Sequence, residues 1–173
     1  LDASMLIACA VFVLAAVTDA LDGHLARRWR VVSRFGRIMD PFADKVLVLG
    51  AFVMLAGPAF MTDGGAIVSG VAPWMVVVIL ARELLVTSIR AILEGEGIDC
   101  SAGWAGKAKM ILQAVVVPLI LLLLAWGIPE RGSARSWAID IGVWATVAAT
   151  VVSGIPYVTR AITAGRPSRK TPQ

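Results

Sequence analysis

Five long apolar stretches alternate with short polar segments along this chain. The apolar stretches cover residues 5–22, 45–60, 72–93, 109–127 and 137–160. Each is close to the roughly 20 residues with which an α-helix crosses a bilayer. The segments between them contain Gly and Pro and are too short for a soluble domain. The pattern predicts an all-α polytopic membrane protein with five spans, in which residues 1–173 form a single domain.

The composition agrees with this pattern, because 58% of the residues are hydrophobic, 16% are charged and the mean hydropathy is +0.82. Basic residues are distributed unevenly between the two ends of the predicted spans. Twelve Lys and Arg residues fall in 23–45, 94–109 and the segment from 160 onward, whereas 58–71 and 127–136 contain only two. Because the more basic segments stay in the cytoplasm, we expect residues 23–45 and the C-terminal segment to face it, with the chain in the cytoplasmic membrane.

The first polar segment, "DALDGHLARRWRVVSRFGRIMDPFAD" at residues 19–44, contains four aspartates. At 100° per residue, Asp19 and Asp22 share one helical face with Gly23 and Ala26, and Arg27 lies beside it. Carboxylates at the end of a membrane span are costly unless they are paired or bind a ligand. A functional site is therefore the first hypothesis for this face.

A second stripe follows, because Gly36, Asp40 and Asp44 recur every four residues on the next predicted helix. If the two faces meet, four carboxylates repel one another, and divalent cations would relieve this repulsion. An all-oxygen ligand set suits Mg²⁺, Mn²⁺ or Ca²⁺. The chain has a single histidine, His24, and no cysteine cluster, which disfavours a zinc site. Metals beside arginines at a membrane surface indicate phosphate chemistry on a lipid precursor.

The small residues of these stripes leave two interpretations open. They let a bulky ligand approach the helix backbone, or they let membrane helices pack closely.

The spacing of these residues resembles the signature of the CDP-alcohol phosphotransferase family. The matching positions are Asp19-x2-Asp22-Gly23-x2-Ala26-Arg27-x8-Gly36-x3-Asp40-x3-Asp44. The resemblance implies a six-helix membrane fold, usually a homodimer, that uses two divalent ions, Mg²⁺ or Mn²⁺. Its members displace CMP from a CDP-linked substrate with an alcohol. The family has a further helix before the signature helix, so we expect an additional helix upstream of residue 1.

The resemblance also implies roles for the individual positions. Asp19, Asp22, Asp40 and Asp44 would bind the metals, and Asp44 would also be the general base for the acceptor hydroxyl. The cytidine nucleotide would lie against the small residues and Arg27 would contact its phosphates, which makes Gly23, Ala26, Arg27 and Gly36 the nucleotide-binding set.

Later segments bear on the acceptor. The stretches "ARELLVTSIRAILEGEG", "GWAGKAKMILQ" and "TVVSGIPYVTRA" are similar to the bacterial phosphatidylglycerophosphate synthase branch of the family. That branch joins CDP-diacylglycerol to sn-glycerol 3-phosphate and releases CMP, so the resemblance implies these two substrates for phospholipid biosynthesis. The alternatives within the family are phosphatidylglycerol, as in a cardiolipin synthase, an inositol phosphate, or serine.

Three basic residues are candidates for binding the acceptor phosphate. Arg82 and Arg90 lie eight residues apart, about 80° around one helix, in a span where unpaired charge is disfavoured. Lys107 lies at the start of the next span. The alternatives are a structural ion pair between Glu83 and an arginine, and a lysine that only extends to the interface. A function of another class, a divalent-cation carrier, also stays open, although we find neither broken helices nor internal repeats.

Overall fold

The computed structural model describes residues 2–29, 34–98 and 104–164, and within these ranges it leaves the side chains of 23–29, 34–41, 44, 105 and 164 undescribed. The described residues form five long helices and one short 3-10 helix, with no strand beyond an isolated bridge between Met61 and Ile67. The elements are α1 (Ala3–Trp29), α2 (Arg34–Leu55), η1 (Pro58–Phe60), α3 (Pro73–Gly95), α4 (Trp104–Ala125) and α5 (Ala134–Ala164). The predicted all-α architecture is confirmed.

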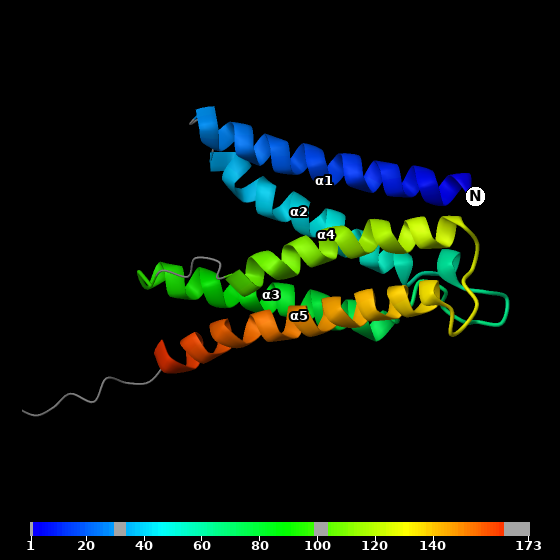
Figure 1. The fold of residues 1–173 in the computed structure, drawn as a ribbon. Helices are drawn as coiled ribbons and strands as arrows, with labels where there is room; N and C mark the ends of the chain where they lie inside the picture. The colour runs from blue at the N-terminus through cyan, green and yellow to red at the C-terminus, as the bar shows by residue number, and fades with distance from the viewer. Residues whose placement is uncertain (1, 30–33, 99–103, 165–173) are drawn as a thin grey trace, which may run out of the picture.

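The five helices lie alongside one another, and the chain reverses direction from each helix to the next (Figure 1). As a result α1, α3 and α5 end where α2 and α4 begin, at the left of Figure 1. We call this end of the bundle the signature end. The helices that flank the three basic segments of the sequence, 23–45, 94–109 and the segment from 160 onward, meet here.

Three helices are long and apolar enough to cross a bilayer among the residues that the structure describes. They are Ala3–Asp22 of α1, Gly106–Ala125 of α4 and Ala134–Thr163 of α5. The other two helices fall short of the predicted spans by this criterion. In α2 the apolar part is only Lys45–Leu55, because the helix begins with the charged signature. In α3 the apolar sequence is interrupted by Arg82, Glu83 and Arg90.

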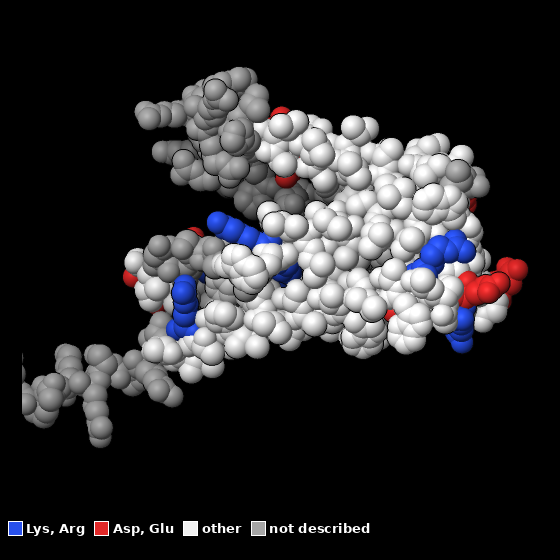
Figure 2. Space-filling model, viewed as in Figure 1, with Lys and Arg blue, Asp and Glu red and all other residues white. Residues whose placement is uncertain are grey.

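One apolar core joins all five long helices. Each contributes at least one side chain with 6% or less of its surface exposed, and examples are Phe12, Phe52, Ile79, Ile120 and Val143. Many other large apolar side chains point outward, among them Leu14 and Ile111. Lipid is the natural contact for such a surface, and Figure 2 shows a largely uncharged middle between two ends that carry charged atoms.

Local contacts fix the helix ends opposite the signature end. Asp2 caps α1, and the Ser4 hydroxyl and backbone N–H, which both donate to its carboxylate, lower the pKa of Asp2. The backbone N–H of Asp2 donates to the Ala125 carbonyl of α4 at 2.8 Å. The buried Ser69 hydroxyl donates to the Leu55 carbonyl at the end of α2 at 2.6 Å. The first of these two bonds fixes how α1 lies along α4, and the second ties the loop before α3 to the end of α2.

Candidate active site

The signature occupies the last turns of α1 and the first turns of α2. These two helices contact each other. Asp19 is half-buried and Asp22 is exposed. The side chains of Gly23, Ala26, Arg27, Gly36, Asp40 and Asp44 lie outside the described residues, so their predicted roles stay predictions. Among the described residues no three His, Cys, Asp or Glu side chains form a metal-binding group, and only two of the four aspartates are in that set.

A cavity of about 430 Å³ opens beside the signature helices. Residues of α2, α3, α4 and α5 line it, namely Lys45, Val48, Leu49, Arg82, Glu83, Val86, Thr87, Arg90, Glu94, Gly106, Lys109, Met110, Gln113 and Tyr157. Lys45 directly follows Asp44 in the chain, and Val48 lies one helical turn after it. Position 44 is therefore at most one turn from a wall of this cavity, which links the cavity to the predicted metal site.

Four basic and two acidic side chains line the cavity, so its formal charge is +2. Basic atoms reach the surface in the hollow near the signature end in Figure 2. Because charged groups within membrane spans are costly and tend to serve a function, this excess of positive charge favours an anionic ligand.

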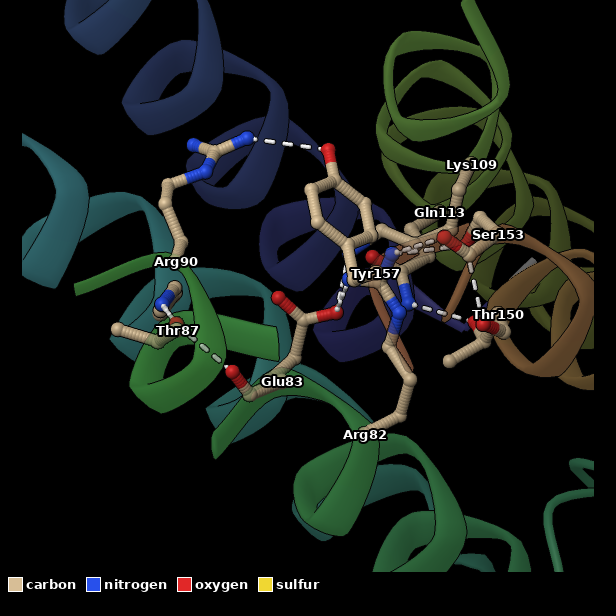
Figure 3. Close-up of polar contacts among 10 residues, drawn as sticks. Arg82, Glu83, Thr87, Arg90, Lys109, Gln113, Thr150, Ser153 and Tyr157 are labelled. Atoms are coloured by element: carbon tan, nitrogen blue, oxygen red, sulfur yellow. Dashed lines mark hydrogen bonds and ion pairs between the residues drawn. The ribbon is translucent and has the colours of Figure 1, made fainter. Parts of the chain in front are cut away.

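Glu83 of α3 lies between two basic residues (Figure 3). Its Oε1 accepts a hydrogen bond from Arg82 Nη1 at 2.9 Å and another from Lys109 Nζ of α4. All three side chains are at least 89% buried, since their exposed fractions are 11% for Arg82, 11% for Glu83 and 8% for Lys109. A buried carboxylate with two cationic partners holds α3 and α4 together at this level.

Arg82 also connects α3 to α5. Its Nη2 donates to the Ser153 carbonyl at 3.1 Å and to the Ser153 hydroxyl at 2.9 Å. The Ser153 hydroxyl donates to the Thr150 carbonyl at 2.9 Å, and Gln113 Nε2 of α4 donates to the Thr150 hydroxyl at 3.3 Å. Figure 3 shows these side chains converging from α3, α4 and α5. The polar network therefore joins three helices where the surrounding surface is apolar.

Arg90 takes part in a second set of contacts nearer the end of α3. Its Nη2 donates to the Tyr157 hydroxyl of α5 at 3.1 Å, and its guanidinium carbon lies 5.5 Å from the centre of the Tyr157 ring. Glu94 approaches Arg90 Nε only to 3.9 Å and is 55% exposed. Lys45 of α2 donates to the Thr87 hydroxyl, which in turn donates to the Glu83 carbonyl at 2.7 Å.

The structure brings two of the three predicted acceptor residues together, because Arg82 and Arg90 both line the cavity. Lys107 is exposed and does not line it, whereas Lys109 does. Sequence analysis also missed Lys45 and Tyr157 as cavity residues. One signal was present: Lys109 and Gln113 lie four residues apart, and polar residues of a membrane helix face the bundle interior.

Comparisons with known proteins agree with the signature. Residues 1–153 match the family described as CDP-alcohol phosphatidyltransferase. The CDP-diacylglycerol–glycerol-3-phosphate 3-phosphatidyltransferase of Bacillus subtilis (strain 168) is 36% identical over 151 residues, which are 87% of this chain and 70% of that protein. A probable phosphatidylglycerophosphate synthase of Mycobacterium tuberculosis (strain ATCC 25618 / H37Rv) is 35% identical over 162 residues, 93% of this chain and 68% of that protein. The chain belongs to the CDP-alcohol phosphatidyltransferase family.

Proposed function

We propose that this chain transfers the phosphatidyl group of CDP-diacylglycerol to sn-glycerol 3-phosphate, giving phosphatidylglycerophosphate and CMP. The observation that carries the proposal is the cavity of charge +2 beside the helix that contains Asp44. It would hold the phosphate of an acceptor whose hydroxyl must reach the general base. The names of the relatives in Bacillus subtilis and Mycobacterium tuberculosis support the same pair of substrates.

In the proposed reaction the acceptor hydroxyl oxygen attacks the phosphorus that carries diacylglycerol. The bond between this phosphorus and the bridging oxygen of the pyrophosphate breaks, CMP leaves with the electron pair, and Asp44 takes the hydroxyl proton. Arg27 would contact the phosphates of the nucleotide, with Gly23, Ala26 and Gly36 beside the cytidine. Arg82 and Arg90 would give positive charge to the cavity that receives the acceptor phosphate. The predicted role of Lys107, at the start of α4, stays a prediction.

Divalent ions fit the residues of this site. The four aspartates lie on the adjoining ends of α1 and α2, and an all-carboxylate set suits Mg²⁺ or Mn²⁺. Bound by Asp19, Asp22, Asp40 and Asp44, two such ions would neutralise the charge that develops on the phosphates.

The expected location is the cytoplasmic membrane, with the signature end facing the cytoplasm. Two observations support that orientation. Residues 23–45, 94–109 and the segment from 160 onward contain twelve Lys and Arg against two in 58–71 and 127–136, and the proposed acceptor is water-soluble. The homodimer that the family resemblance implies stays a prediction.

A panel of acceptors tests the proposal. The purified protein in detergent micelles receives CDP-diacylglycerol and Mg²⁺, and CMP release is measured with glycerol 3-phosphate, phosphatidylglycerol, inositol phosphate or serine. We expect glycerol 3-phosphate to give the highest kcat/KM. Preference for another acceptor would refute the substrate assignment and leave the family reaction intact. Metal uptake into vesicles without any CMP release would favour the cation carrier instead.

A further inference from the structure

The basic side chains of the cavity differ in burial and in the partners that hold them. Arg82 and Lys109 are 11% and 8% exposed, whereas Arg90 is 35% exposed and Lys45 is half-buried. The first two contact a carboxylate directly, within hydrogen-bond distance. Arg90 and Lys45 donate to hydroxyl groups, which orient a cation without cancelling its charge.

Arg82 is held by protein groups on several sides. Its two terminal nitrogens donate to Glu83 and to two oxygens of Ser153. Its stem packs over Gly154 of α5, where an added methyl group would lie 3.4 Å from Cγ and 3.7 Å from Nε of Arg82. The helix α5 therefore covers the edge of the guanidinium that carries Nε, which leaves little of the group to meet a ligand.

The other two cations donate their hydrogen bonds to neutral side chains, and the exposed Glu94 carboxylate approaches Arg90 only to 3.9 Å. Tyr157 is 6% exposed, so its ring is fixed in the core and its hydroxyl holds Arg90 at one position. The Thr87 hydroxyl gives its own proton to the Glu83 carbonyl, which leaves its lone pairs for Lys45. The Nε atoms of Arg90 and Arg82 are both buried and have no hydrogen-bond partner among the described residues, so the two arginines differ in exposure and in carboxylate contact, not in this atom.

We infer that these four cations have two separate roles. Glu83 holds Arg82 and Lys109 as part of the helix scaffold, whereas Tyr157 and Thr87 position Arg90 and Lys45 to contact the acceptor phosphate. We call this the division of the cations. This inference rests on the proposed function. It makes Tyr157 and Thr87 positioning residues for acceptor binding, although neither carries a charge. It also makes Lys45, the residue after the predicted base, part of the acceptor site.

Steady-state kinetics with hydroxyl-deletion variants tests the division. Tyr157→Phe keeps the ring and removes the hydroxyl that holds Arg90, so it should raise the KM for glycerol 3-phosphate by about threefold to tenfold. Thr87→Val should do the same through Lys45. The KM for CDP-diacylglycerol should change less than about twofold in both, since loss of one neutral hydrogen bond at the acceptor site leaves the donor site intact. Thr159→Val is the matched control, because its hydroxyl lies on α5 and, among the described residues, bonds only to the Pro156 carbonyl of its own helix.

A second readout uses inorganic phosphate as a competitor of glycerol 3-phosphate. Its inhibition constant should rise by the same factor as the KM in Tyr157→Phe and Thr87→Val, because the lost contact is to phosphate. Ser153→Ala removes one of the two hydrogen bonds between Arg82 and α5 and keeps the bond to the backbone carbonyl. It should instead lower the melting temperature and leave this constant within about twofold. A loosened bundle would raise the KM of both substrates together.

The division is wrong if Tyr157→Phe and Thr87→Val leave the phosphate inhibition constant unchanged, or if Ser153→Ala raises it as much as they do. Failure of the proposed function has a different signature, since the wild-type protein would then release no CMP on addition of glycerol 3-phosphate. In that case we would measure the rise in melting temperature caused by inorganic phosphate in place of the inhibition constant. Loss of this rise in Arg90→Gln and Lys45→Met, and its retention in Ser153→Ala, would still support the division.

Discussion

We expect Glu83→Gln to destabilise the helix bundle, because the amide keeps the size of the side chain and removes the charge that Arg82 and Lys109 share. Removing one partner of a buried ion pair costs about 3 to 5 kcal/mol, since it leaves a buried charge without compensation. Arg82 retains its two hydrogen bonds to Ser153. Because Arg82 keeps these contacts, we expect a loss near 3 kcal/mol, the lower end of that range.

The free energy of unfolding can be followed through Cys9, which is 6% exposed in the core. The chain has two cysteines, so a Cys100→Ser background leaves Cys9 as the single thiol. Its reaction with a thiol dye, measured across a titration of SDS into mild-detergent micelles, reports the unfolded fraction. Glu94→Gln is the matched control, because Glu94 is 55% exposed and its loss should cost less than about 1 kcal/mol.

A double variant identifies the cause of the loss. Lys109→Met keeps an unbranched apolar side chain and removes the cation. Because residues in contact are energetically coupled, Glu83→Gln should cost less in the Lys109→Met background than in the wild type. The reasoning is refuted if Glu83→Gln lies within about 0.5 kcal/mol of the wild type, the usual range of surface substitutions. It is also refuted if Glu83→Gln costs as much in the Lys109→Met background as in the wild type.

Other predictions use separate measurements. Chelation should abolish CMP release and added Mg²⁺ or Mn²⁺ should restore it, whereas full turnover in excess chelator would contradict the metal site. Asp44→Asn should lower kcat by at least about 10²-fold, the contribution typical of a general base; a near-normal rate would argue for another base. Cysteines introduced at Ser33 and Ser168 should resist labelling by an impermeant reagent added outside intact cells, and labelling of either would contradict the predicted cytoplasmic position of these segments. Gly70→Ala should cost about 1 to 2 kcal/mol of unfolding free energy, because Gly70 has φ +69° and its added methyl would lie 3.0 Å from Ile139 Cγ2; a neutral effect would refute this.

Helix positions could be predicted from the sequence because lipid sets the length of an apolar stretch. Each predicted span overlaps one of the five long helices, and these helices extend past the spans at several ends. The stretch 5–22 belongs to a helix that continues to Trp29, since a helix need not end where the hydrocarbon does. The predicted span 45–60 extends past the end of the observed helix, because α2 ends at Leu55 and Pro58 begins a separate 3-10 helix.

Contacts between helices could not be predicted in the same way. Both faces of α4 are apolar, so hydropathy does not tell which face is buried. Lys107 and Lys109 differ by about 200° around that helix, and Lys109 is the one on the buried face with Gln113 and Ile120. Periodicity places residues on a face of their own helix, whereas the rotation of one helix against another depends on packing that a single sequence does not reveal.

The packing of α2, α3, α4 and α5 brings together the charged side chains of the cavity, and the resulting charge bears on which acceptor it can bind. Two divalent ions would balance the four signature aspartates, so the +2 charge of the cavity is left for the acceptor. A phosphate monoester carries about −1.5 to −2 at neutral pH and matches it. Phosphatidylglycerol, a diester, carries one negative charge, and serine carries no net charge. Glu83, between α3 and α4, already offsets part of the positive charge of the cavity. The negative charge of the acceptor must therefore balance only the positive charge that remains.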